Sequence, residues 1–300
     1  MSSRKVTKVV IPVAGMGTRF LPVTKALPKE LLPIVDKPII HYIVREAIDA
    51  GIETVVFVTA RPKILIEDYF DPKDLTSYKL SEAGKDSLIE EVLAISKKID
   101  IVSVRQYEPR GLGHAILQAS PVVSGQAFSV VLGDDIILES GLSALGQCLE
   151  SFSSAFDSGA AGSVIGCIEV PRAQTGLYGI ASLRNEDPKS PFCEISGFVE
   201  KPSPAKAPST WAMPGRYVFE DDILRALKET APGVNGEIQL TDAMQSMLSS
   251  GKRFFARKIS GERYDTGDKL GYIIANIAVA LKDRALEAPL REWLKNKLAL

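Results

Sequence analysis

The chain has 300 residues, 45% of them hydrophobic, and is long and apolar enough to bury a core without disulfides or structural metals. Its 36 Lys and Arg residues nearly balance its 37 Asp and Glu residues, and the net charge of −1 excludes a global basic field that would recruit nucleic acid. The sequence has no run of about eighteen apolar residues and no apolar segment typical of a signal peptide, so we expect a cytoplasmic protein with no membrane partner.

The first half of the chain alternates strand-like and helix-like segments. Residues 6–13 are rich in β-branched side chains and predict a buried strand that ends at the turn Ala14-Gly15. Lys37-Pro38 predicts the start of a helix with proline at its first position, and Gly51 predicts its end. The next predicted elements are a strand at 54–58, a helical region at 63–98, a strand at 101–105, a helix at 115–120 and a buried strand at 128–132. This alternation predicts an α/β fold with a Rossmann-like, mostly parallel sheet flanked by helices, whose ligands bind at the carboxyl ends of the strands.

Beyond Gly162 the sequence changes to shorter strand-like segments separated by proline-rich loops. The predicted strands lie at 163–170, 178–183, 195–202 and 215–219, and the predicted helices at 237–248, 270–280 and 289–298. We interpret this part as an insertion that carries the pocket of a second substrate. The proline-rich residues 203–214 fit an exposed loop and a lid about equally well.

The three cysteines predict neither a disulfide framework nor a metal site. Cys148, Cys167 and Cys193 form no CxxC pair, and their number is odd. We therefore expect three buried, unreactive thiols in a protein that works in a reducing compartment.

The glycine turn that follows the first strand is the first cluster with chemical meaning. Gly15 and Gly17 allow backbone amides to approach a phosphate or a base closely. A Rossmann fingerprint needs a third glycine where Phe20 stands, and a P-loop needs a Gly-Lys-Ser/Thr sequence that is missing, so a NAD-dependent oxidoreductase is disfavoured. Arg19 follows the turn directly and Lys29 lies in a segment stiffened by prolines. Two such cations fit a polyphosphate that gains charge as it leaves, and solvated surface positions are the alternative.

Charged residues also follow two later strands. Asp134 follows Gly133 at the end of the strand at 128–132, where it is either a Mg²⁺ ligand or a solvated turn residue. Glu200 and Lys201 end another strand, where they are either a surface ion pair or contacts to sugar hydroxyls and a phosphate. Neighbours on a regular strand point to opposite faces, so a shared ligand requires the strand to end or bend near Pro202.

A long stretch of the sequence resembles a known signature. The stretch GMGTRFLPVTKALPKELLPIVDKPII is similar to that of the sugar-1-phosphate nucleotidyltransferases, in the form found in the bacterial members that act on UTP and glucose 1-phosphate. The segments RGLGHAIL, FVEKP, GRYVF, GEIQLTDA and YDTGDKLGY are also similar in form and order, so the resemblance covers nearly the whole chain. It implies a fold of the nucleotide-diphospho-sugar transferase type and attack by a sugar phosphate on the α-phosphorus of UTP, with release of pyrophosphate.

The resemblance also implies roles for individual residues. Those implied to bind the nucleotide are Ala14, Gly15, Gly17, Thr18, Gln106 and Gly111, and those implied to be catalytic are Arg19, Lys29 and Lys201. The residues implied to bind the sugar phosphate are Gly179, Glu200, Lys201 and Gly215. Asp134 and Asp265 are implied to hold Mg²⁺ as the cofactor, although Asp265 taken alone predicts a helix N-cap. Gln106 and Gly111 match positions that contact the uracil edge, which suits an amide with both a donor and an acceptor.

By the same resemblance, residues 1–272 form the nucleotidyltransferase domain, with a nucleotide-binding part at about 1–140 and a sugar-phosphate-binding part at about 160–268. Residues 273–300 are expected to form a helical segment that contacts another subunit of a homodimer or homotetramer. The alternatives are a thymidylyltransferase for glucose 1-phosphate and a non-catalytic regulatory paralogue that binds sugar nucleotide. We give His41 and His114 no catalytic role, and the roles of His114 and Asp135 stay open.

Overall fold

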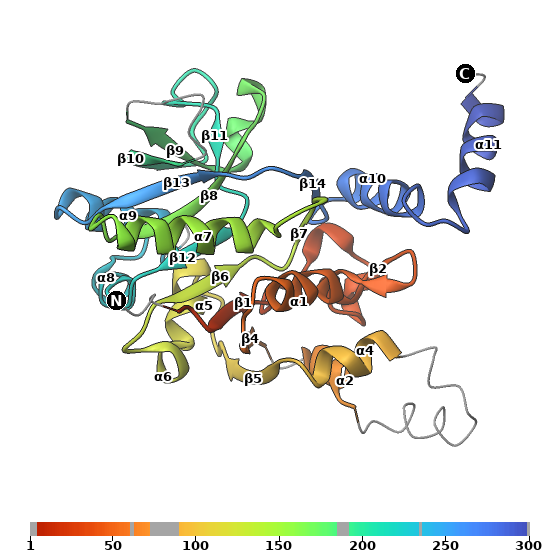
Figure 1. Cartoon of the computed structure of the whole chain (residues 1–300), viewed down its shortest axis with the longest axis horizontal. Coiled ribbons are helices and arrows are strands. Elements are labelled where there is room, and N and C mark those ends of the chain that lie inside the picture. Colours follow the sequence, from red (N-terminus) through yellow and green to blue (C-terminus); the bar gives the residue numbers. More distant parts are fainter. Residues whose placement is uncertain (1–4, 61–62, 73–89, 185–191, 234–235, 299–300) are drawn as a thin grey trace.

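A ten-stranded mixed sheet forms the centre of the molecule (Figure 1). The structure is a computed structural model that describes residues 5–60, 63–72, 90–184, 192–233 and 236–298. The strands lie in the order β11, β9, β10, β13, β8, β12, β6, β1, β4, β5. Their bounds are β1 Lys8–Pro12, β4 Thr54–Thr59, β5 Asp100–Arg105, β6 Phe128–Val131, β8 Ser163–Glu169, β9 Gly179–Leu183, β10 Phe192–Glu200, β11 Trp211–Ala212, β12 Arg216–Phe219 and β13 Phe254–Lys258.

The N-terminal part of the sheet is parallel, as predicted. β1 pairs in parallel with β4 on one side, with Val9 opposite Val55, and with β6 on the other, with Val9 opposite Ser129. The chain runs from β1 outward through β4 to β5 and then returns to place β6 on the opposite side of β1. This reversal opens a crevice at the carboxyl end of β1, which is where open α/β sheets bind ligands.

The second half of the sheet is largely antiparallel and continuous with the first. β12 pairs antiparallel with both β6 and β8, and β13 lies between β8 and β10. Strand β11 pairs with β9 and also with β8, so β8, β11, β9, β10 and β13 close into a ring. The residues that were expected to form an exposed loop or a lid therefore include a strand, β11, whose Ala212 is fully buried.

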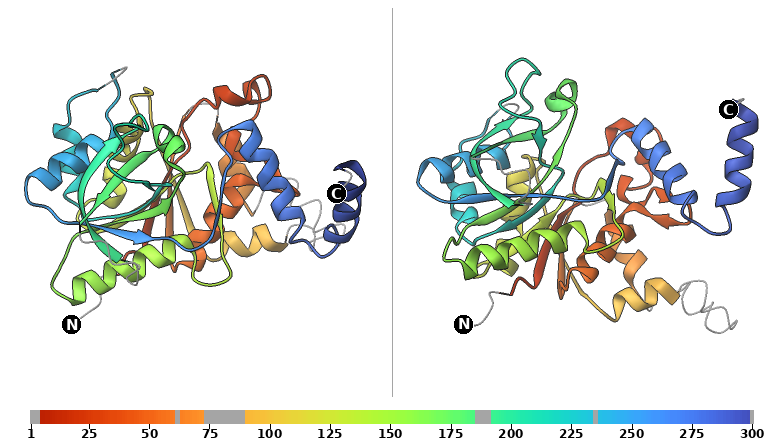
Figure 2. Two further views of the ribbon diagram at one scale, coloured as in Figure 1. Left: turned by 90° about the horizontal axis from the view of Figure 1, so that it is seen from above. Right: turned by 45° about the horizontal axis from the view of Figure 1, so that its top comes forward.

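Helices cover both faces of this sheet. Their bounds are α1 Ile39–Asp49, α2 Ile64–Phe70, α4 Glu90–Ser96, α5 Leu112–Gln118, α6 Ser120–Val123, α7 Ala144–Asp157, α8 Ile223–Glu229, α9 Leu240–Ser249, α10 Lys269–Ala280 and α11 Glu287–Leu298. Alternate residues of β1 divide the core: Val9 and Ile11 pack in the cluster that includes α1 and α7, and Val10 packs with α5, α8 and α9. In Figure 2 the last helix, α11, stands away from the rest of the chain, and none of its residues is buried.

The β2–β3 hairpin, a two-stranded antiparallel sheet of β7 and β14, and four 3₁₀ turns complete the described structure. The remaining strands are β2 Pro33–Ile34, β3 Lys37–Pro38, β7 Asp135–Leu138 and β14 Glu262–Asp265, and the 3₁₀ turns are η1 Thr18–Phe20, η2 Val23–Lys25, η3 Lys29–Leu31 and η6 Arg172–Leu177. The expectation that proline occupies the first position of α1 is wrong. Pro38 is the N-cap with extended backbone, because Lys37 and Pro38 pair with Pro33 and Ile34 as the β2–β3 hairpin.

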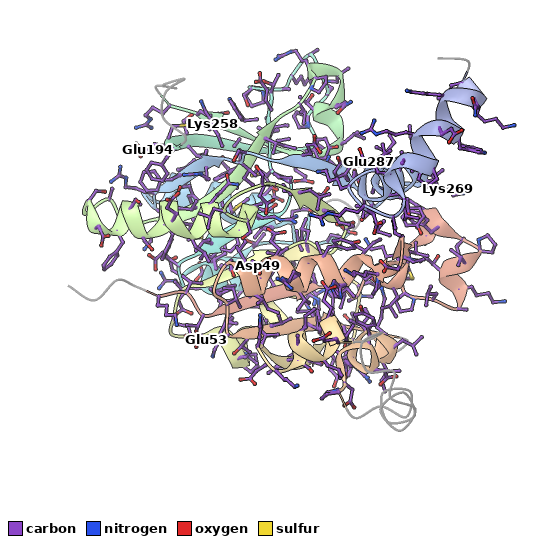
Figure 3. The ribbon with its side chains drawn as sticks, turned by 45° about the vertical axis from the view of Figure 1, so that its right-hand side comes forward. Asp49, Glu53, Glu194, Lys258, Lys269 and Glu287 are labelled. Atoms are coloured by element: carbon purple, nitrogen blue, oxygen red, sulfur yellow. The ribbon has the colours of Figure 1, made fainter. Side chains whose placement is uncertain are left out.

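The expected helical region at 63–98 and the expected free cysteines are confirmed within the described residues. The helical region at 63–98 contains α2 and α4, and its residues 73–89 lie outside the described part of the chain. The three cysteines are free and buried. No helix among the described residues is long and apolar enough to cross a membrane. Charged side chains such as Asp49, Glu194 and Glu287 lie at the surface (Figure 3).

Candidate active site

Two cavities meet at the carboxyl end of β1. Their volumes are about 730 and 340 Å³, and Ala14, Gly15 and Gln106 line both of them. The smaller cavity also reaches Lys29 and Asp134, so two of the clusters that the sequence separates by about a hundred residues face one space.

The turn at Gly15 and Gly17 is fixed because it packs closely against Thr24 and against Lys29 in η3. Gly17 has φ of +64°, and a Cβ there would lie 3.1 Å from both Lys29 Cβ and Thr24 Cγ2. Thr24 Oγ1 donates a hydrogen bond of 2.8 Å to the Gly17 carbonyl. Glycine is therefore required for the loop to lie directly on η3. Thr18 and Arg19, at the start of η1, stay exposed beside it.

Lys29 and Asp134 form an ion pair at the rim of the smaller cavity, with 2.7 Å between Lys29 Nζ and Asp134 Oδ2. Burial raises the pKa of Asp134, but the Lys29 ammonium outweighs it and holds the pKa below its ordinary value. Burial lowers the pKa of Lys29, and the Asp134 and Glu30 carboxylates reverse that change and raise it. Both groups are therefore charged near neutral pH. On the other side of η3, Glu30 accepts a 2.6 Å hydrogen bond from Lys63 in a buried pair that fixes the segment.

The two-stranded antiparallel sheet of β7 and β14 brings the two predicted metal ligands together. Its register places Asp265 opposite Asp135, the neighbour of Asp134. The Thr266 amide and hydroxyl donate to the Asp134 carbonyl at 2.9 and 2.8 Å, which fixes the turn after Asp265 against Asp134.

Asp134 and Asp265 share a small space that fits a hard cation. A Cβ on Gly267 would lie 3.0 Å from Asp265 Oδ1 and 3.2 Å from Asp134 Oδ2, so glycine leaves room between the two carboxylates. Two carboxylates with further sites for water and phosphate oxygens are a usual Mg²⁺ arrangement. Asp265 does not cap α10: its Oδ1 accepts from the Gly267 amide, and Asp268 is the N-cap, accepting from the amides of Leu270 and Gly271.

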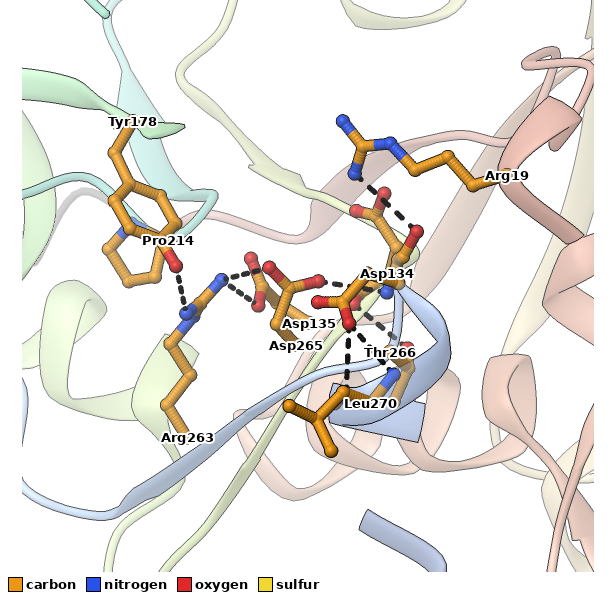
Figure 4. Close-up of polar contacts among 12 residues, drawn as sticks. Arg19, Asp134, Asp135, Tyr178, Pro214, Arg263, Asp265, Thr266 and Leu270 are labelled. Carbon is orange, nitrogen blue, oxygen red and sulfur yellow. Dashed lines mark hydrogen bonds and ion pairs between the residues drawn. The ribbon is translucent and has the colours of Figure 1, made fainter. Parts of the chain in front are cut away.

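Arg263 connects the aspartates to the second half of the chain (Figure 4). Its Nη2 lies 2.5 Å from Asp135 Oδ1 and 3.3 Å from Asp265 Oδ2, and its Nη1 donates a 2.8 Å hydrogen bond to the Tyr178 hydroxyl. Burial, together with the nearby Asp134 and Asp265 carboxylates, raises the pKa of Asp135 to about 7 in spite of Arg263. The sequence analysis did not select Arg263. Arg263 stands two residues before Asp265, and residues with this spacing on a strand point to the same face.

The strand that carries Glu200 ends where a shared ligand requires it to end. β10 stops at Glu200, and Lys201 has φ of +43°, a left-handed conformation that turns the chain. The Lys201 amide donates to the Tyr178 carbonyl at 3.0 Å, and its side chain remains 61% exposed. Glu200 Oε2 accepts a 2.6 Å hydrogen bond from Thr241, which the sequence analysis did not select.

Gly179 and Gly215, the two glycines predicted to bind the sugar phosphate, both lie where the chain packs closely. A Cβ on Gly215 would lie 2.5 Å from Leu132 Cγ, and the Leu132 amide donates to the Gly215 carbonyl. A Cβ on Gly179 would lie 3.1 Å from Glu200 Oε2. The backbone at Gly215 therefore lies against the chain that leads from β6 to Asp134.

The loop after β5 forms the remaining wall. Gln106 is 8% exposed. Its backbone amide donates to the Thr59 carbonyl, and its side-chain Nε2 donates to the Gly111 carbonyl at 3.2 Å. Gly111 has φ of +92°, and a Cβ there would lie 2.9 Å from Glu237 Cβ. The loop is held against the segment before α9 by the Ile238 amide, which donates to the Arg110 carbonyl.

The chain is similar to known proteins over nearly its whole length. The profile of the nucleotidyl transferase family matches residues 8–281. UTP–glucose-1-phosphate uridylyltransferase of Bacillus subtilis strain 168 is 43% identical over 297 residues, which cover 98% of this chain and 99% of that one. The UTP-bound UGPase from Acinetobacter baumannii superposes with a TM-score of 0.87 at 36% identity over 97% of this chain and 99% of that one. A UDP-glucose pyrophosphorylase complexed with UDP-glucose has a TM-score of 0.81 at 38% identity over 93% of this chain and 100% of that one. The chain therefore belongs to the nucleotidyl transferase family, on the branch of the bacterial UTP–glucose-1-phosphate uridylyltransferases.

Proposed function

We propose that the protein transfers a uridylyl group from UTP to α-D-glucose 1-phosphate and produces UDP-glucose and pyrophosphate. The observation that carries this proposal is the meeting of Lys29 and Asp134 at 2.7 Å in a cavity that Gly15, Gln106 and Gly111 also line. The names of similar proteins support it, since one such structure holds UTP and another holds UDP-glucose.

The chemistry requires positioning and charge compensation rather than a strong base. A phosphate oxygen of glucose 1-phosphate forms a bond to the α-phosphorus of UTP, the bond from that phosphorus to the bridging oxygen breaks, and pyrophosphate leaves with the electron pair. The attacking oxygen is already anionic, so the protein has to bring two anions together in line. Arg19 and Lys29 are the cations placed to compensate the charge on the departing phosphates.

Asp134 and Asp265 would hold Mg²⁺, because their oxygens flank the space at Gly267 and the pKa of Asp134 keeps it ionised. When bound, Mg²⁺ supplies positive charge to the phosphate oxygens. With Asp134 so occupied, the Lys29 ammonium would be available to bind phosphate oxygens.

The sugar phosphate is assigned to the second half of the chain. Glu200 accepts sugar hydroxyl hydrogens, Lys201 binds the phosphate, and the backbone at Gly179 and Gly215 lines the site. Residues 1–140 thus hold the nucleotide and residues 160–268 the sugar phosphate. Tyr178 connects Lys201 to Arg263, since its carbonyl accepts from the Lys201 amide and its hydroxyl from Arg263, and Arg263 in turn pairs with Asp135 of the first part.

We also propose that the protein works as a homodimer or homotetramer through its C-terminal helices. Large apolar side chains of α10 and α11 are exposed, among them Leu270 at 67%, Ile273 at 53% and Trp293 at 57%. Figure 3 shows Lys269 and Glu287 at the starts of these two helices, on one side of the molecule. A second copy of the chain would cover these side chains.

The test is pyrophosphate release with a panel of nucleotides and sugar phosphates, with and without Mg²⁺. We expect release to require glucose 1-phosphate and Mg²⁺, and to be fastest with UTP, followed by dTTP, CTP and the purine triphosphates. The methyl group that separates dTTP from UTP is expected to cost roughly 10–200-fold at most. A protein that releases no pyrophosphate with any pair would overturn the proposal and favour a regulatory binding role.

A further inference from the structure

The side-chain amide of Gln106 is held by two acceptors at once. Its Nε2 lies 3.2 Å from the Gly111 carbonyl oxygen and 3.0 Å from Nδ1 of His114, a residue of α5 without a role so far. An amide nitrogen carries two hydrogens, and these two neighbours use both. The other amide atom, Oε1, is the remaining acceptor of a side chain whose residue lines both cavities.

The contacts also decide which atoms of this group carry protons. The Gly111 carbonyl only accepts, so the atom of Gln106 that faces it is the amide nitrogen. His114 Nδ1 therefore accepts, and the proton of the neutral ring lies on Nε2. The Gln118 amide lies 3.2 Å from that nitrogen, and a half-turn of this amide presents its oxygen to the proton.

The ionisation of His114 agrees with this arrangement. Burial and the Arg110 guanidinium lower the pKa of His114, and together they outweigh the Glu108 carbonyl and carboxylate, which raise it. The ring is therefore neutral near pH 7, and Nδ1 has a lone pair to accept with.

We propose that His114 is a positioning residue that fixes the Gln106 amide with Oε1 toward the nucleotide base and thereby selects uracil over cytosine. This inference rests on the proposed function and names a source of its base specificity. Uracil presents an N3–H donor that Oε1 accepts, whereas cytosine presents a lone pair at N3 that Oε1 repels.

His114 matters because the Gly111 carbonyl alone holds the amide with one bond. Without His114, a rotation of the Gln106 side-chain amide by a half-turn would exchange Oε1 and Nε2. It would give up the one hydrogen bond to Gly111 and gain a new one to cytosine N3. With His114 in this tautomer, the same half-turn turns Oε1 toward two acceptors and gives up both bonds. Regaining the bond to His114 requires the ring proton to move from Nε2 to Nδ1 and the Gln118 amide to turn back. Buried polar groups without partners are costly, so the fixed amide disfavours cytosine strongly.

The experiment measures kcat/KM for UTP and CTP in competition, with saturating glucose 1-phosphate, for the full-length protein and its variants. His114→Leu removes the acceptor, and His114→Ala is the second such variant in case the first does not fold. His114→Asn is the matched control, because asparagine Oδ1 branches from the same carbon as Nδ1 and accepts a hydrogen bond. Gln106→Ala removes the base contact itself.

We expect His114→Leu to lower the UTP to CTP ratio about tenfold, mainly through a higher KM for UTP and with kcat changed little, and His114→Asn to restore most of the ratio. An unchanged ratio in both His114→Leu and His114→Ala, with Gln106→Ala clearly less selective, overturns the role of His114 alone. Equal loss in His114→Asn and His114→Leu also overturns it, since the acceptor would then not matter. Unchanged selectivity in Gln106→Ala instead overturns the assignment of the base to this loop.

Discussion

The ion pair of Lys29 and Asp134 compensates the charges of two side chains to which we assign separate roles in the reaction. Neither group is left unpaired at the cavity rim before substrates arrive, which avoids the cost of a desolvated single charge. In the proposed reaction, phosphate oxygens would pair with Lys29 and a cation with Asp134, so each side chain would again have a partner of opposite charge.

Asp134 is the first residue on which this proposal can be tested. Asp134→Asn keeps the shape of the side chain and removes its charge, so we expect kcat to fall by at least about 100-fold while the protein stays folded. Asp268→Asn is the control, because asparagine is an equally good N-cap for α10 and the residue has no proposed role in catalysis. Steady-state pyrophosphate release and far-UV circular dichroism measure the two effects, and a well-folded Asp134→Asn protein with near-normal Mg²⁺-dependent turnover contradicts the assignment.

Lys201 and Lys29 are expected to differ in the kinetic constant they affect. Lys201→Ala should raise KM for glucose 1-phosphate by about tenfold or more and KM for UTP much less, because its side chain lies beside Glu200, to which we assign the sugar hydroxyls. Lys29→Ala should instead lower kcat, since it withdraws stabilisation of the departing pyrophosphate. Initial rates with each substrate varied in turn separate the two, and the reverse pattern would move Lys201 to the triphosphate side.

Some residue roles follow from the sequence and others need the fold. Glycine turns with flanking charges mark Gly15, Arg19 and Lys29 as a group, because the signal is local. Arg263 lies opposite Ile137 in the β7–β14 register, from where its side chain reaches Asp135, and no spacing in the sequence reports that register. Asp265 is brought to Asp134 in the same way, by a pairing between segments far apart in the chain.

At the scale of elements, the first turn of α10 is packed onto the strand that carries Asp265. A Cβ on Gly271 would lie only 1.9 Å from the Asp265 carbonyl oxygen, which is backbone and has no rotamer to change. The helix therefore reaches this close only with glycine at that position. Its approach determines where the turn with Asp265 and Gly267 lies.

Gly271→Ala is expected to displace that turn. We predict a loss of stability of about 1–3 kcal/mol, as for other overpacked sites, and a fall in kcat of at least about tenfold. Gly141→Ala is the control, because nothing lies within 4 Å of the Cβ it adds. Urea unfolding and pyrophosphate release on both variants provide the measurement, and equal behaviour of the two would show that α10 does not position Asp265.

Most elements were predictable because their signals are periodic. The buried strands β1, β4 and β6 and the helix α1 follow from apolar runs and helical spacing. The start of α1 was wrong because the same Lys37-Pro38 pair completes a two-residue hairpin, and a pairing that short leaves no periodic pattern. Strand β11 was missed for a similar reason: two residues are too few to alternate, and neighbouring strands hold them.

At the scale of the whole molecule, α10 and α11 are the helices that we expect to contact another subunit in the proposed homo-oligomer. The double change Ile273→Glu with Ile274→Glu places charges among exposed apolar side chains of α10, and we expect it to convert the oligomer to single chains. Ile64→Glu, at an equally exposed apolar position on α2, is the control and should leave the assembly intact. Light scattering coupled to size-exclusion chromatography gives the mass, and a wild-type protein that is already a monomer contradicts the proposal.

The place of β13 in the sheet has a consequence for how the chain is made. The four parallel strands can pair as soon as residue 131 has left the ribosome. The ring formed with β8, β11, β9 and β10, however, has to wait for Phe254–Lys258, which lie between β8 and β10. Until then both of those strands have an open edge, the kind of surface on which nascent chains associate with one another. A nascent chain arrested after β10 has emerged, but before Phe254–Lys258 have emerged, therefore exposes two unpaired strand edges, and the ring is completed only once β13 is available.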